Sequence, residues 1–258
     1  MSRQPGGYIG FNRVPAASGA HSAASGVWTL REAEAMRRAG TWPTSSSTVL
    51  LLHMEGSGQT FADSSPVTKT VTAGGNATQT AAQSKFGSQS AAFDGSGDSI
   101  FATSSEFVFG TQDFTIECWL RPNWASSAAF ARVIQAGDFP TDGGWQLVRN
   151  SSGTGLIFDI TNGSSSQARL QGGALTSGQW YHVAVTRSGS NLRMFVGGAQ
   201  VDSVTSSPYS LTSDHIRIGG NSTGGDSLSG HIDEVRLSRG EARYTGAFSE
   251  PTAAFPDS

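Results

Sequence analysis

The feature that most constrains this fold is a two-residue alternation of apolar and polar side chains. It is clearest in 113–122, where Phe114, Ile116, Cys118 and Leu120 alternate with threonine, glutamate, tryptophan and arginine. Successive side chains of a β-strand point to opposite faces, so this segment predicts a half-buried strand. Cys118 then lies on the apolar face, where we expect a small buried side chain rather than a reactive thiol.

Segments of similar character recur along the chain, separated by turns rich in Gly, Ser and Asn. Those predicted as strands are 49–56, 98–105, 113–122, 145–149, 156–160, 179–187, 192–198, 199–205, 215–220 and 230–240. So many short strands predict an all-β sandwich or barrel, and 33 glycines with only 14% charged residues suit tight turns. The candidate interior side chains are Phe93, Phe114, Ile116, Leu120, Val183, Val185, Phe195 and Ile218.

The first 43 residues have a different character. Residues 1–26 hold few large apolar side chains, which predicts an extended arm. A short helix is predicted at about 29–39, because Thr29 and Glu32 form a capping box and Gly40 and Pro43 end the segment. A helix of this length is not stable alone in water, so it must dock on its own β domain, a sister subunit or another protein.

The predicted organisation is therefore an anchoring arm at 1–43, a polar linker at 44–48, a β domain at 49–248 and a Pro-rich tail at 249–258. We expect the tail to run along the surface. The side chains predicted to anchor the arm are Tyr8, Phe11, Trp28, Leu30, Met36 and Trp42.

Composition excludes several classes of protein. The net charge of -3 and the absence of a basic stripe argue against nucleic-acid binding. A single cysteine excludes an internal disulfide framework and a cysteine-based zinc cluster. The first residues lack the apolar run of a secretory signal, and no stretch approaches 18 apolar residues. We therefore expect a soluble protein that is made in the cytoplasm.

The order of six segments resembles the laminin-G-like branch of the concanavalin-A-like jelly rolls. These segments are 53–66, 84–100, 114–122, 178–198, 216–220 and 230–244, so the resemblance covers about residues 48–248. It implies an antiparallel jelly-roll sandwich of two stacked sheets. It also implies two family-typical features, carbohydrate binding and a structural calcium ion.

The ending at 233–255, DEVRLSRGEARYTGAFSEPTAAF, is similar to laminin-G-like modules of bacteriophage virion proteins, and 6–43 resembles the start of phage structural proteins. This resemblance implies a virion location, as a tail fibre or a head decoration. The partners would be other virion proteins, further copies of the chain and host-surface glycans. The alternative is a free, non-catalytic lectin-like module whose arm folds back on its own domain.

Catalysis is not expected. Glycoside hydrolases of this general fold need two carboxyl groups close together, about 5–5.5 Å apart in retaining enzymes. The nearest candidates are Asp233 and Glu234, whose side chains would point to opposite faces of a regular strand. The five histidines do not pair at a metal-ligand spacing.

Two kinds of binding residue remain as candidates. Acidic residues that match a structural calcium site are Asp63, Asp94, Asp98 and Asp233. Alternatively, the first three cap their own turns. Aromatic residues that could stack on a sugar are Trp124, Trp145 and Tyr209, although such residues near sandwich loops also serve as partly buried supports. No other cofactor is expected.

Overall fold

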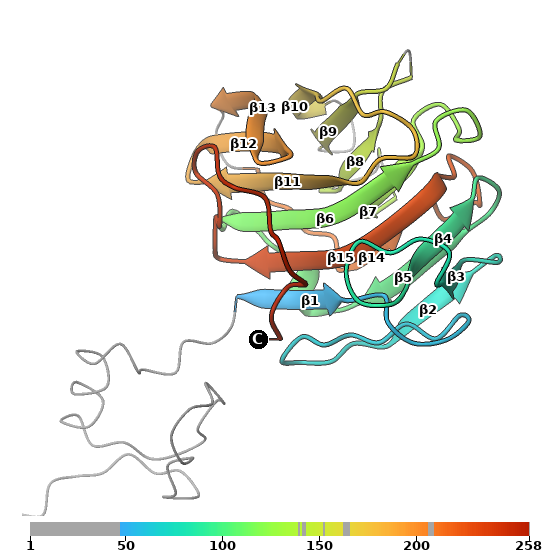
Figure 1. The fold of residues 1–258 in the computed structure, drawn as a ribbon. Helices are drawn as coiled ribbons and strands as arrows, with labels where there is room; N and C mark the ends of the chain where they lie inside the picture. Colours follow the sequence, from blue (N-terminus) through green and yellow to red (C-terminus); the bar gives the residue numbers. More distant parts are fainter. Residues whose placement is uncertain are drawn as a thin grey trace, which may run out of the picture. The chain divides into compact units, whose positions relative to one another are not determined.

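The computed structural model describes residues 47–257 except 139, 141–142, 152, 162–165 and 206–208. The predicted arm, its helix at about 29–39 and the anchoring residues Tyr8, Phe11, Trp28, Leu30, Met36 and Trp42 lie outside the described residues. The described part confirms the predicted fold class, because it forms two antiparallel sheets stacked as a sandwich (Figure 1).

The eight-stranded sheet has the order β13-β12-β11-β6-β15-β4-β3, and β1 also pairs with β15. Its strands are β1 (Thr48–Leu52), β3 (Thr78–Thr80), β4 (Ser90–Asp94), β6 (Phe114–Pro122), β11 (Tyr181–Ser188), β12 (Asn191–Val196), β13 (Ala199–Thr205) and β15 (Ser229–Arg239). β6 and β15 lie at the centre of this sheet, so side chains on their outer face are surrounded by neighbouring strands.

The seven-stranded sheet has the order β10-β9-β8-β7-β14-β5-β2. Its strands are β2 (Val71–Gly74), β5 (Ser99–Thr103), β7 (Arg132–Ala136), β8 (Trp145–Arg149), β9 (Leu156–Thr161), β10 (Ser166–Gly172) and β14 (His215–Ile218). A short 3-10 helix, η1 (Ser105–Phe107), follows β5. No helix among the described residues is long and apolar enough to cross a membrane.

All ten predicted segments contain a strand, and five further strands, β2, β3, β4, β7 and β10, were not predicted. The missed strands are rich in Thr, Ala, Gln and Gly or carry no clear alternation, as in SQARLQG of β10. Their pairing with a neighbour, such as β10 with β9, makes them strands.

The main core lies between the sheets and includes the predicted residues Phe114, Ile116 and Leu120. Cys118 is also buried there, and burial raises the pKa of its thiol well above the ordinary value, which fits an unreactive side chain. Phe195 is buried, but it lies outside this core. Its ring packs instead against Tyr244 and Phe248, with centroids 6.2 and 5.3 Å away.

A third layer explains this difference. After β15 the chain turns back and crosses the outer face of the eight-stranded sheet, in front of β11, β6 and β15 (Figure 1). Near its end Phe255 is only 4% exposed and forms a second apolar cluster with Leu51 and Trp119. The tail that we expected to run along the surface is thus packed into the domain through Phe255.

Candidate functional site

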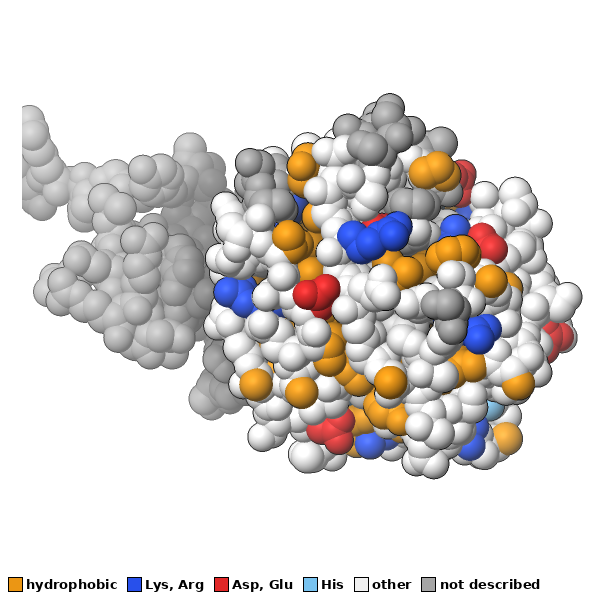
Figure 2. Space-filling view, turned by 90° about the horizontal axis from the view of Figure 1, so that it is seen from above, with side chains coloured by type: hydrophobic (Ala, Val, Ile, Leu, Met, Phe, Trp, Pro, Cys, Tyr) orange, Lys and Arg blue, Asp and Glu red, His pale blue; other side chains and the backbone are white. Residues whose placement is uncertain are grey.

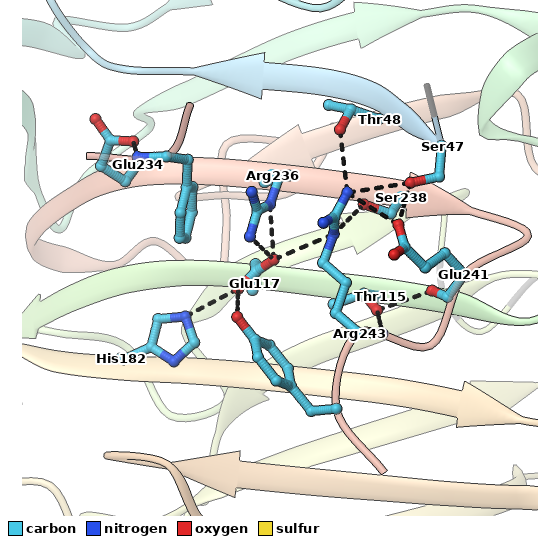
Figure 3. Close-up of polar contacts among 12 residues, drawn as sticks. Ser47, Thr48, Thr115, Glu117, His182, Glu234, Arg236, Ser238, Glu241 and Arg243 are labelled. Atoms are coloured by element: carbon cyan, nitrogen blue, oxygen red, sulfur yellow. Dashed lines mark hydrogen bonds and ion pairs between the residues drawn. The ribbon is translucent and has the colours of Figure 1, made fainter. Parts of the chain in front are cut away.

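The outer face of the eight-stranded sheet carries a buried polar network around Glu117 of β6 (Figure 3). Arg236 of β15 donates from Nε and Nη2 to Glu117 Oε1, at 2.8 and 2.7 Å. His182 Nε2 and the Tyr244 hydroxyl donate to Glu117 Oε2, at 3.0 and 2.8 Å. The carboxylate therefore ties three strands of the sheet to the crossing segment.

This network is structural. Burial alone would raise the pKa of Glu117, but the hydrogen bond from His182 and the charge of Arg236 hold it below its ordinary value. The residue is 1% exposed, so a solvent-borne substrate does not reach the carboxylate. Its oxygens already accept from three side chains, which makes Glu117 an anchor for residues 241–257.

A β-bulge in β15 changes the environment of Asp233 and Glu234. The register with β6 shifts between Asp233 and Arg236, and Glu234 has a φ of 49°. The prediction that these two carboxylates point to opposite faces assumed a regular strand, which the bulge interrupts. Both are buried: Asp233 Oδ2 accepts from the N–H groups of Lys85 and Phe86, and Glu234 Oε2 accepts from that of Phe255 at 2.7 Å.

Two groups at this bulge have raised pKa values. Burial raises the pKa of Asp233 to about 7, against the opposing effect of its backbone hydrogen bonds. The hydrogen bond to Glu234 raises the pKa of His53 to about 9. His53 Nδ1 lies 2.9 and 3.0 Å from the two Glu234 oxygens, and its Nε2 lies 3.0 Å from Asp257 Oδ1.

The domain is therefore expected to lose stability as the pH rises from about 5 to 9. The native state retains a proton on Asp233 up to about pH 7 and on His53 up to about pH 9, whereas the unfolded chain releases them near 3.8 and 6.5. Because His53 is partly exposed, its contribution is discounted. We expect the free energy of unfolding to fall by about 1–3 kcal/mol over this pH range. Thermal melting at pH 5.5, 7 and 9 measures this loss of stability. Equal melting temperatures at the three pH values would contradict the prediction. The variant His53→Gln should flatten the part of the profile above pH 6.5.

The structure places two of the predicted sugar-stacking residues in the core. Trp124 is 5% exposed and its Nε1 donates to the Leu175 carbonyl at 2.8 Å. Trp145 is 1% exposed and stacks near Phe109 and Phe158. Neither ring presents a free face to a sugar, so both act as the buried supports that we considered as the alternative. Tyr209 is half-buried and packs against the main core.

The four predicted calcium ligands do not form a site that fits the ion. Each carboxylate accepts hydrogen bonds from backbone N–H groups: Leu51, Ser65 and Lys69 for Asp63; Ser96 for Asp94; Asn76 and Asp94 for Asp98; Lys85, Phe86 and Glu234 for Asp233. Within the described ranges, no three His, Cys, Asp or Glu side chains gather as a metal ion would need. These acids organise turns and the bulge.

An open hollow of about 330 Å³ lies where β6 ends and β15 begins. Its lining residues are Phe93, Arg121, Pro122, Asn123, Ser177, Gly178, Ser229, Gly230 and His231. Arg121 and His231 face each other in the register of the two strands. Sequence analysis missed these residues, because no local motif links positions 110 apart, and only strand pairing brings them together.

Two glycines shape the hollow. Gly178 has a φ of 81° and its N–H donates to the Pro122 carbonyl at 2.8 Å, which brings the turn after Ser177 against the end of β6. Gly230 has a φ of 138°, and a Cβ there would lie 2.4 Å from the Arg121 carbonyl oxygen. A larger residue at position 230 would therefore push the two strands apart.

The hollow is polar and carries an unpaired positive charge. Among the residues that the structure describes, Arg121 has no acidic partner and no hydrogen-bonded acceptor. Burial and the charge of Arg121 lower the pKa of His231, which favours the neutral imidazole, and its Nδ1 is buried without a partner. Hydroxyl and amide groups of Asn123, Ser177 and Ser229 complete the set of donors and acceptors.

The outer face of the seven-stranded sheet is a second polar surface. Several of its groups bond to one another, but Gln146 Oε1 and Arg217 Nε are buried without a partner among the described residues. Arg132 Nε donates to Gln135 Oε1 at 2.7 Å, and Arg169 makes two bonds to Asp159 at 2.7 and 2.8 Å. Arg217 lies over the Phe101 ring at 4.3 Å. On the face seen in Figure 2, charged side chains are scattered among uncharged ones and form no basic stripe.

Comparisons with known proteins agree with this fold. The binding domain of botulinum neurotoxin serotype D has a TM-score of 0.60 at 14% identity, over 77% of this chain and 50% of that one. Domain 4 of AbnA, an extracellular arabinanase from Geobacillus stearothermophilus, has a TM-score of 0.58 at 17% identity, over 77% of this chain and 95% of that one. The neurotoxin type D/C binding domain has a TM-score of 0.55 at 15% identity, over 74% and 47%.

The chain thus spans about half the length of the neurotoxin binding domains that it matches. A search of curated protein sequences finds no match. Residues 93–242, more than half of the chain, match the laminin G-like family described as the concanavalin A-like lectin/glucanases superfamily. This range runs from β4 to the segment after β15 and includes every residue that lines the hollow. The chain belongs to the concanavalin A-like lectin/glucanases superfamily.

Proposed function

We propose that this chain is a non-catalytic carbohydrate-binding protein and that the hollow between β6 and β15 is its binding site. The observation that carries the proposal is the hollow itself, where donors and acceptors from Arg121, Asn123, Ser177, Ser229 and His231 converge. Sugars are oriented in their binding sites by such sets of convergent polar groups.

The likeness to carbohydrate-binding domains supports the proposal. The arabinanase domain 4 structure holds arabinotriose, and the neurotoxin type D/C structure is a complex with SialylT. A neurotoxin type C structure is concerned with interaction with two ganglioside molecules. The arabinanase domain carries the most weight, because the aligned region covers 95% of it.

A glycan array probed with the purified full chain tests this function. Saturable binding to a defined set of saccharides, reproduced by calorimetry with the free sugar, is the expected result. An array with no saturable signal, together with silent calorimetry, would rule out the proposal. Release of reducing sugar from a bound polysaccharide would instead indicate a hydrolase.

We also propose that the domain is displayed on a bacteriophage virion, as a decoration or a host-surface adhesin, through the predicted arm at 1–43. The support is the sequence of that segment, whose short helix needs a partner and offers Trp28, Leu30, Met36 and Trp42 for burial. Each large side chain fully buried would contribute about 1.5–3 kcal/mol to docking. Other virion proteins, and copies of the same chain, are the proposed partners.

Gold-antibody labelling of purified particles, viewed by electron microscopy, tests the virion location. Label on the shell or tail is expected, and a variant without residues 1–43 should fold but fail to enter particles. Unlabelled particles with the protein left in the lysate would favour the free lectin-like module. Incorporation of the shortened chain would contradict anchoring through the arm.

A further inference from the structure

We propose that the hollow selects saccharides that carry a carboxylate, such as a uronic acid or a sialic acid, through Arg121. This inference rests on the proposed function and names the ligand class of the same site. Arg121 lines the hollow opposite His231.

The charge on Arg121 is available to a ligand. No acidic side chain of the described domain forms an ion pair with it, whereas Arg132, Arg169, Arg236 and Arg243 each lie against a carboxylate. A guanidinium presents its N–H groups in a planar fork that matches both oxygens of a carboxylate. An unpaired guanidinium in a polar hollow therefore favours an anionic group over a hydroxyl.

The position of the guanidinium fits this role. A Cβ added to Gly178 would lie 3.6 Å from Arg121 Nη2, so the charged end of the side chain reaches the turn that closes the hollow. Because residue 178 is glycine, no side chain covers the guanidinium from that side.

Neighbouring groups can hold the rest of the sugar. Asn123 Nδ2 lies 3.4 Å from Ser229 Oγ, a weak bond that a ligand hydroxyl could replace. Burial and the charge of Arg121 lower the pKa of His231, which favours the neutral imidazole and adds no second charge to the hollow. These neutral groups suit ring hydroxyls, which leaves Arg121 to recognise the anion.

The experiment compares matched acidic and neutral sugars on the full chain. Calorimetry with 3′-sialyllactose against lactose, and with methyl β-glucuronide against methyl β-glucoside, measures the preference for a carboxylate. At least one acidic sugar should bind about tenfold more tightly than its neutral partner, and 0.5 M salt should reduce this preference because it screens a charge pair.

Variants test whether Arg121 causes the preference for a carboxylate. Arg121→Gln should abolish the preference for the acidic sugar, and Arg121→Lys should retain part of it. Arg217→Gln is the matched control, since Arg217 also has no acidic partner in the described domain but lies on the other sheet. Melting temperatures of the two Arg121 variants should match the parent, because Arg121 holds no ion pair within the described domain.

Each outcome decides between the two proposals. Equal binding of acidic and neutral sugars, or an acid preference that survives in Arg121→Gln, would overturn this inference and leave carbohydrate binding intact. Loss of binding in Arg217→Gln but not in Arg121→Gln would move the site to the seven-stranded sheet. Silence with every sugar, acidic and neutral, would count against the proposed function as a whole.

Discussion

Replacing Glu117 by alanine is expected to lower the stability of the domain by about 3–5 kcal/mol, the usual cost of removing one partner from a buried ion pair. Arg236 would be left as a buried charge, and His182 and Tyr244 would lose their common acceptor. For a domain of this size the melting temperature should fall by about 10 °C. Thermal unfolding followed by circular dichroism measures this change.

Matched variants distinguish the effect of removing the Glu117 network from the effect of removing a glutamate elsewhere in the domain. Glu250→Ala removes an exposed carboxylate and should change stability by less than about 0.5 kcal/mol. Glu117→Gln keeps the shape and one acceptor, so it should fall between the parent and Glu117→Ala. A melting temperature for Glu117→Ala within about 2 °C of the parent would show that the crossing segment is held by its apolar contacts alone.

The Glu117 network also shows what the sequence pattern could not predict. Alternation in 113–122 identifies β6 because Phe114 and Ile116 are buried between the sheets. The pattern also places Glu117 and Trp119 on the opposite face, which a two-layer sandwich exposes to solvent. Both are buried, because residues 241–257 form a third layer over that face and Phe86 also packs against Trp119. A two-residue period records which face is more apolar, and it does not record what covers the other one.

The candidate site could not be predicted from the sequence, for a related reason. Arg121 and His231 become neighbours only when β6 and β15 pair, although they lie far apart along the chain. The bulge at Glu234 likewise depends on this pairing, and an isolated strand pattern gives no sign of it. Conversely, Trp124 and Trp145 were candidates for sugar stacking because they lie near glycine-rich loops, but both rings are buried in the main core. Side-chain type indicates what a residue can do, and tertiary contacts decide whether ligands reach it.

In the tail, Phe255→Ala is expected to lower the free energy of unfolding by about 3–5 kcal/mol, as for other buried phenylalanines. The ring fills the cluster with Leu51 and Trp119, and the Arg236 guanidinium lies 4.0 Å from its centroid. Its loss would leave a cavity over β1 and β6 and would expose the edge of the Glu117 network. Chemical denaturation at constant pH measures the free energy of unfolding.

Phe130→Ala is the control, since the same atoms are removed from a side chain that is 43% exposed, and its stability should stay within about 0.5 kcal/mol of the parent. Deleting residues 249–258 should cost at least as much as Phe255→Ala, because Glu234 also loses the N–H of Phe255 and His53 loses Asp257. Hydrogen exchange in β1 should quicken in both tail variants. Unchanged exchange and stability would mean that the tail merely rests on the sheet, and that residues 47–248 fold without it.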